Sequence, residues 1–268
     1  MTGIGQWLAR MILLLWVTLA LLAPLLPLAP NQVDLGRILA PPQIGLWLGA
    51  DELGRPVLDR LLIGAQMALL IGIGVVGLSA LIGTVLGAFA AFVGGWWDHL
   101  LVRVIDVFLA MPGLLLAIAL AGLLGPGGTN LVLALVTVGW VGYARLARAQ
   151  ILSLRRRDHI QAARALGVGT WPMIWRHLLP LAFAPLLVEA TFGVAAAIVA
   201  EAGLSFLGLG VQPPAASWGT MIRDGVAYML VSPHLVLAPG VVLMLVVLAV
   251  NLVGDQFRDH LDSRMDRF

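Results

Sequence analysis

Long continuous runs of apolar residues dominate the chain, and short polar segments separate them. Six runs are long enough to cross roughly 30 Å of hydrocarbon as helices. They lie at about 9–29, 66–93, 104–124, 130–150, 183–208 and 234–254. Because the apolar residues are continuous rather than alternating, the pattern favours a bundle of helices over a barrel. It predicts an all-α integral membrane protein with six transmembrane helices.

The same pattern divides the chain into four parts. We expect an N-terminal transmembrane helix in residues 1–30, an extracytoplasmic segment in 31–65, a core of five further spans in 66–255 and a cytoplasmic tail in 256–268. A cleaved signal peptide is the alternative interpretation of the first run. That run is long for a signal core and no small-x-small cleavage site follows it, which favours a retained helix.

The outer segments contain two further local patterns. The stretch Leu48–Leu62 predicts an interfacial elbow: a short helix capped by Asp51 or Glu52 that lies on the membrane surface. After the fifth run, a proline-rich loop leads to Trp218, whose ring suits the headgroup level of a membrane.

Composition supports a membrane protein and excludes several kinds of chemistry. Hydrophobic residues make up 60% of the chain and charged residues only 11%. There is no cysteine, which excludes disulfides, thiolate metal sites and cysteine nucleophiles. There is no lysine either, so the chain contains no G-x-x-x-x-G-K-[ST] phosphate loop. Any work driven by ATP must therefore come from a partner, and a net charge of only +2 does not indicate nucleic acid.

Arginine supplies all sixteen basic residues, and its distribution predicts the orientation of the chain. If the amino terminus is cytoplasmic, the outer segments contain only four arginines, and the remaining twelve fall in cytoplasmic segments. The four outer residues are Arg37, Arg55, Arg60 and Arg223. This bias satisfies the positive-inside rule and predicts that both termini lie in the cytoplasm.

The longest cytoplasmic loop, residues 155–180, is basic and amphipathic. We expect a first helix around Gln161, Ala162 and Ala163 that ends at Gly167 or Gly169, because glycine adopts left-handed backbone angles at little cost. A second short helix would present Trp171 on an apolar side and would stop at Leu179-Pro180. Two successive short helices with an apolar tip predict a finger that docks on another protein.

At the finger the chain resembles the permease subunits of binding-protein-dependent ABC importers. Their signature is E-A-A, three residues, G, nine residues and I-x-L-P. The matching positions here are Gln161, Ala162, Ala163, Gly167, His177, Leu179 and Pro180. Gln161 replaces the acidic residue and His177 replaces isoleucine, so the contacts at these two positions depart from the family pattern.

Four further blocks extend the resemblance from about residue 48 to residue 262. They are Leu48–Arg60, Gly142–Arg148, Gly203–Gly219 and Asn251–Asp262, and they look like the second permease of the dipeptide, oligopeptide and nickel importer class. The resemblance implies a type I permease fold, a second homologous permease as partner, two ATP-binding subunits and an extracytoplasmic solute-binding protein. ATP and Mg²⁺ would be held by the ATPases, and no cofactor by this chain.

The resemblance also implies what the chain transports and where it acts. It favours short peptides over nickel or a nickel chelate, and a bacterial or archaeal inner membrane as the location. The finger would receive the force of the ATPases through Gln161, Ala162, Ala163, Gly167, Trp171, His177, Leu179 and Pro180. A channel or scaffold that does not pump is a more distant alternative, because it would need no docking finger.

Polar residues inside the spans are candidates for the translocation path, because ionisable groups are costly in hydrocarbon. Glu201, Ser205 and Asn251 are the residues we expect to line it, and Glu201 could contact a cationic group of the solute. A carboxyl that is hydrogen-bonded between helices is the alternative for Glu201. Glu189 also lies in the fifth span, and we expect it to pair with a neighbouring subunit. The histidines form no i, i+4 pair, so no metal site is predicted.

Overall fold

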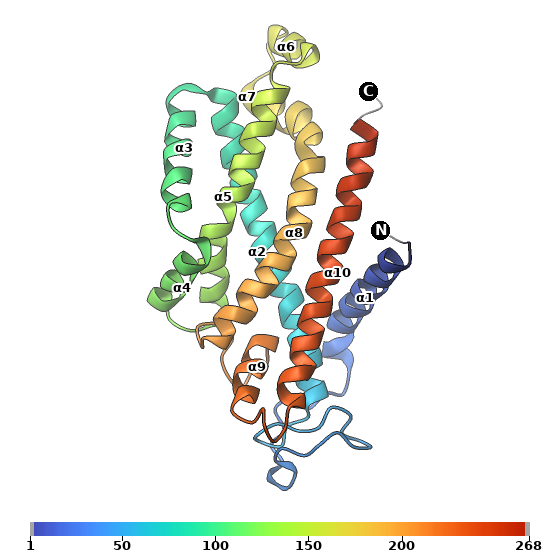
Figure 1. Ribbon diagram of the computed structural model, residues 1–268. Helices are drawn as coiled ribbons and strands as arrows, with labels where there is room; N and C mark the ends of the chain where they lie inside the picture. The colour runs from blue at the N-terminus through green and yellow to red at the C-terminus, as the bar shows by residue number, and fades with distance from the viewer. Residues whose placement is uncertain (1–2, 266–268) are drawn as a thin grey trace.

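The computed structural model describes residues 3–265 of the chain and the side chains of residues 5–259. Within these residues the fold is a bundle of helices with only two isolated β-bridges (Figure 1). The α-helices are α1 (Gly3–Leu22), α2 (Val57–Val93), α3 (Gly95–Leu109), α4 (Gly113–Leu124), α5 (Gly128–Leu154), α6 (Asp158–Ala165), α7 (Thr170–Pro172), α8 (Leu179–Phe206), α9 (Trp218–Val226) and α10 (His234–Met265). Short 3-10 turns, η1 (Ala23–Leu25) and η2 (Leu35–Arg37), and a π-helical segment, η3 (Met173–Leu178), complete the list.

Five helical stretches are long and apolar enough to cross a membrane, namely Gly5–Leu25, Val57–Val93, Gly128–Leu154, Thr170–Phe206 and His234–Asp259. The predicted span at 104–124 is not one continuous helix. It is instead the pair α3 and α4, which meet at an angle of 86°. Pro112 explains the break, since proline lacks a backbone donor and disfavours helical angles in the residue before it. With this bent pair taken as one span, the chain has the six predicted crossings.

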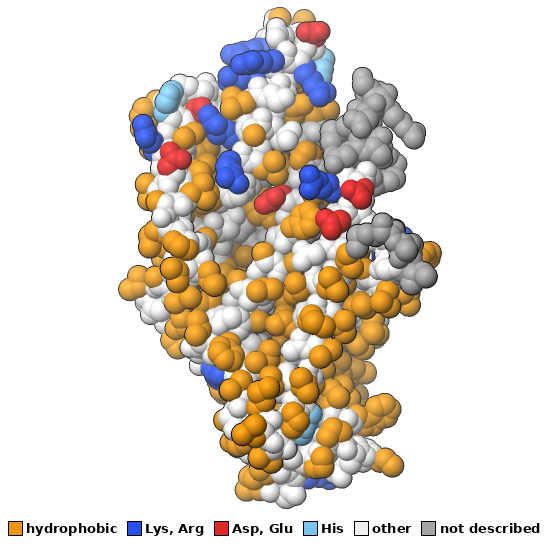
Figure 2. Space-filling model, in the orientation of Figure 1, with side chains coloured by type: hydrophobic (Ala, Val, Ile, Leu, Met, Phe, Trp, Pro, Cys, Tyr) orange, Lys and Arg blue, Asp and Glu red, His pale blue; other side chains and the backbone are white. Residues whose placement is uncertain are grey.

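The bundle is arranged with two distinct ends. In Figure 1 the finger helix α6 and the carboxyl end of α10 lie at one end, and the 26–56 loop and α9 lie at the other. Charged side chains gather toward the α6 end in Figure 2, and hydrophobic side chains cover most of the remaining surface in that view. This distribution is that of a protein whose middle is surrounded by lipid.

The core of the bundle depends on the close packing of α2 against α5. A Cβ atom added at Gly83 would lie 2.8 Å from the backbone nitrogen of Ala144, and one added at Gly87 would lie 3.0 Å from the Ala144 carbonyl carbon. These two glycines form a G-x-x-x-G pair. Small residues allow such an approach where the hydrophobic effect does not drive helices together.

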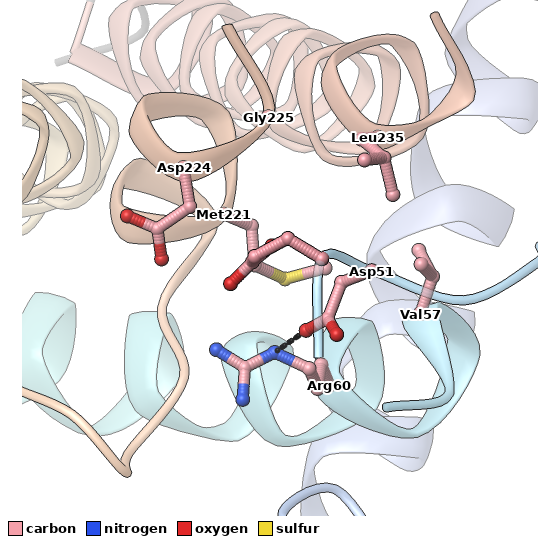
Figure 3. Close-up of a pocket in the computed structure, with 8 residues that line it drawn as sticks. Asp51, Val57, Arg60, Met221, Asp224, Gly225 and Leu235 are labelled. Atoms are coloured by element: carbon pink, nitrogen blue, oxygen red, sulfur yellow. Dashed lines mark ion pairs between the residues drawn. The ribbon is translucent and has the colours of Figure 1, made fainter. Parts of the chain in front are cut away.

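The end opposite the finger differs from the expected interfacial elbow. Residues Val57 and Leu61 are buried in the first turns of α2 rather than lying on the membrane surface. Asp51 caps no helix. Its carboxylate accepts hydrogen bonds from two backbone amides of the 51–55 turn and forms salt bridges with Arg55 (2.7 Å) and Arg60 (3.4 Å). Figure 3 shows Asp51 and Arg60 around one small pocket with Asp224 of α9.

Trp218 is also placed differently from its predicted headgroup position. Its side chain is fully buried, and the indole N–H donates to the carbonyl oxygen of Leu61 at 3.1 Å. Gly64 provides the space, because a Cβ there would lie 2.7 Å from the indole ring. The side chain therefore joins α9 to α2 instead of anchoring the protein in lipid headgroups.

Candidate functional site

The finger begins with α6, which ends where the chain adopts a left-handed turn at Gly167. The φ angle of Gly167 is 83°, and the amide of Val168 donates back to the carbonyl of Ala163 at 3.2 Å. This is the hydrogen-bond pattern that closes many helices. Of the two glycines that could end the first helix, the structure uses Gly167.

The second half of the finger continues into the membrane without a break. The segments α7 and η3 lead directly into α8, so the prediction that Leu179-Pro180 stops the helix is wrong. Pro180 lies in the first turn of α8, where the missing donor is tolerated. The base of the finger is rigidly packed, since Met173, Ile174 and Leu178 are buried in the core formed with α5.

The predicted docking residues fall into two groups. Gln161, Ala162, Gly167 and Trp171 are exposed, and Trp171 also stacks on Phe89 of α2 with ring centroids 5.8 Å apart. The second group lies nearer the core or on α8. Ala163, His177 and Leu179 are half-buried, and Pro180 is exposed on α8. Leu166, which the sequence analysis did not select, is 86% exposed at the turn. Its place between the E-A-A-like motif and Gly167 could have identified it.

Glu201 and Ser205 are enclosed at the far end of α8, which differs from the expected position in an open path. The Glu201 side chain is only 1% exposed and accepts a hydrogen bond from the Ser205 hydroxyl at 2.7 Å. Ser205 in turn accepts from the amide of Val211 at 3.2 Å. Ser217, the N-cap of α9, lies beside the Glu201 carboxyl. These contacts hold the 207–217 loop against α8. Glu201 is therefore placed as the hydrogen-bonded carboxyl that the sequence analysis gave as the alternative to a residue of the path.

A different set of polar groups faces a cavity in the middle of the bundle. The cavity has a volume of about 300 Å³ and is lined by α2, α4, α5 and α8. Most of its walls are alanine, valine, leucine and glycine, and the polar exceptions are Ser79, Tyr143 and Glu189. Asn251 lies half-buried on α10 and is not among the lining residues. Within residues 5–259 the structure contains no cluster of three potential metal ligands.

The sequence analysis did not identify this cavity, although one signal was present. Ser79 and Tyr143 each interrupt a long apolar span, and Glu189 is ionisable. Polar residues at these positions are costly in lipid. Only the fold shows that three separate helices bring them to one space.

Comparison with known proteins identifies the family. Residues 83–267 match the family described as "Binding-protein-dependent transport system inner membrane component". The chain is 38% identical over 237 residues to the glutathione transport system permease protein GsiD of Pectobacterium atrosepticum, covering 88% of this chain and 79% of that protein. The GsiD protein of Escherichia coli matches equally well, at 38% identity over 88% of this chain and 78% of its own length.

The fold has a counterpart among solved structures. The inward-facing MetNI methionine ABC transporter contains a chain that aligns with a TM-score of 0.61 at 19% identity, covering 76% of this chain and 97% of that one. These findings confirm the type I permease fold and the family resemblance predicted from the finger and the four blocks. The chain therefore belongs to the family of binding-protein-dependent transport system inner membrane components, and it is a multi-pass membrane subunit of an ABC importer that works with ATPase subunits and a binding protein.

Proposed function

We propose that this chain and a second, homologous permease together form the path by which short peptides enter the cell. Two partner ATPases would bind ATP and Mg²⁺ and drive the transport, and a binding protein would deliver the solute from outside. The glutathione permeases that are 38% identical to this chain over 237 residues support a peptide as cargo, because glutathione is itself a short peptide.

The orientation of the chain follows from the proposed coupling. The α6 end would face the cytoplasm with both termini, and the end formed by α9 and the 26–56 loop would face the binding protein. The four arginines predicted to lie outside include Arg55 and Arg60, which pair with Asp51 at the end opposite the finger. This agreement between charge and fold supports the assignment.

The finger is the observation that carries the proposal. Its tip exposes Leu166 and Trp171, whereas its base is buried and continuous with α8. A rigid element of this kind can transmit a displacement, because packed helices move as units. We therefore propose that Gln161, Ala162, Gly167 and Trp171 contact an ATPase, and that the helix containing His177, Leu179 and Pro180 carries the motion into α8.

Substitution of Gly167 by valine tests this coupling role. A left-handed angle costs a β-branched residue about 1–2 kcal/mol, which corresponds to roughly a 5–30-fold loss of the docking-competent turn. In proteoliposomes with the complete transporter, we expect ATP-dependent peptide uptake to fall by at least about five-fold, while the chain still inserts and purifies normally.

Gly167→Asn is the matched control, because asparagine tolerates left-handed angles better than other residues with side chains. We expect this variant to retain most of the uptake. Normal uptake by Gly167→Val, or equal loss in both variants, would contradict the proposed role of the turn. Absence of ATP-dependent uptake by the unmodified transporter would contradict the proposed function itself.

A further inference from the structure

Two hydroxyl groups in the central cavity lack hydrogen-bond partners within the described chain. The Ser79 side chain belongs to α2 and the Tyr143 side chain to α5, and their residues are only 1% and 5% exposed. A buried polar group without a partner costs about 1–3 kcal/mol, so native structures seldom retain one without a reason. Both residues line the cavity, which has room for a ligand.

Glu189 of α8 completes this set of polar groups. It lines the same cavity and lies close enough to Tyr143 for an electrostatic interaction. The residue is nine positions beyond Pro180, about 14 Å along α8, in a helical stretch long and apolar enough to span a membrane, and it is exposed. No hydrogen bond or salt bridge to Glu189 occurs among the described residues. An intramembrane carboxyl without such a partner indicates a functional site.

Three glycines create the space that these polar groups occupy. A Cβ at Gly139 would lie 2.7 Å from the Ser79 hydroxyl oxygen, and one at Gly142 would lie 3.4 Å from a carboxylate oxygen of Glu189. A Cβ at Gly193 would collide with the Tyr143 hydroxyl. Each polar group therefore lies against a glycine of a neighbouring helix. The sequence leaves room for these groups instead of filling the cavity with apolar side chains.

We propose that this cavity is a transient subsite for a primary ammonium group, such as the free amino terminus of a peptide in transit. Glu189 would be the counter-ion, and the oxygens of Ser79 and Tyr143 would accept the remaining ammonium hydrogens. This inference rests on the proposed function and adds the chemical group that the path recognises. It assigns the role of counter-ion for the solute to Glu189 rather than to the enclosed Glu201.

The chemistry of the lining selects an ammonium group over other ligands. No arginine or histidine is among the residues that line the cavity, so an anionic group would meet only the like charge of Glu189. Ca²⁺ and Mg²⁺ prefer six or more oxygen ligands, which one carboxylate with two hydroxyls does not supply, and the lining contains no imidazole for Zn²⁺ or Ni²⁺. An ammonium group has three donors, which match the three acceptors, and charged hydrogen bonds of this kind are the strong ones.

Protection of an introduced cysteine tests the subsite without involving the binding protein. The chain contains no cysteine, so Ala196→Cys, at an exposed residue of the cavity lining with no role in the proposed subsite, provides a single thiol there. The assembled transporter would be labelled with N-ethylmaleimide, and mass spectrometry of this chain would give the rate. We expect alanylalanine to slow the labelling by about three-fold when its concentration is twice its dissociation constant. N-acetyl-alanylalanine, which lacks the ammonium group, should give no protection.

Substitution of Glu189 separates recognition of the ammonium group from simple occupation of the cavity by a dipeptide. Adding Glu189→Gln to Ala196→Cys should abolish the protection by alanylalanine. Adding Asp106→Asn, which removes an exposed carboxylate of α3 outside this cavity, should preserve it. Equal protection by both dipeptides, protection by neither, or protection that persists after Glu189→Gln would overturn the subsite. Active ATP-driven peptide uptake by the unmodified transporter in the same preparation would leave the proposed function standing.

Discussion

Two glutamates on the same helix, Glu189 and Glu201, have opposite surroundings. They are twelve residues apart on α8, which corresponds to about 18 Å. Glu201 is enclosed and hydrogen-bonded to the side chain of Ser205, whereas Glu189 is exposed to a cavity that contains two hydroxyls without partners. The difference shows that an ionisable residue in a span can have either of two roles. Its hydrogen bonds, rather than its charge, distinguish a structural carboxyl from one that is available to a ligand.

Substitution of the enclosed Glu201 is expected to have the largest effect on stability. Glu201→Ala would leave a void and remove the acceptor of the buried Ser205 hydroxyl, at a cost of about 2–4 kcal/mol. We expect the melting temperature of the purified transporter to fall by roughly 5–15 °C. Glu189→Ala should change it by less than about 2 °C, because that carboxylate has no hydrogen bond to lose. Similar losses for the two variants would remove the distinction between them.

The glycines around the cavity give a smaller effect on stability. Gly193→Ala adds a methyl group that collides with the Tyr143 hydroxyl, and overpacking of this kind costs about 1–3 kcal/mol. Gly203→Ala lies on the same helix, and its added Cβ would contact nothing within 4 Å. We therefore expect thermal unfolding of the transporter to shift downward only for Gly193→Ala. If Gly203→Ala destabilised the transporter equally, the cavity would not be the cause.

The sequence predicted the outline of the fold because the responsible signals are local. Continuous apolar runs determine the spans, and left-handed angles require a residue such as Gly167 at the end of α6. The bend between α3 and α4 was missed because the run 104–124 is apolar apart from Asp106, although Pro112 was the sign of a break. Trp218 was misplaced because a headgroup anchor and a buried tryptophan have the same local pattern.

Of the candidate site, the finger could be predicted from local signals and the cavity could not. The finger is one continuous segment, so its motif and spacing could be read directly. The cavity combines Ser79, Tyr143 and Glu189, which are more than forty residues apart from one another and come from three helices. Only the packing of α2, α5 and α8 shows that they are neighbours. For Glu201 the missing information was the loop that folds back to hydrogen-bond its neighbour Ser205.

The most direct measurement is the maximal rate of ATP-dependent peptide uptake by proteoliposomes that contain the complete transporter with Glu189→Gln. Loss of a charged hydrogen bond to the ammonium group of the peptide predicts a fall of about ten-fold or more, with the melting temperature unchanged. An uptake rate equal to that of the unmodified transporter would contradict the account, because Glu189 would then take no part in the passage of the solute.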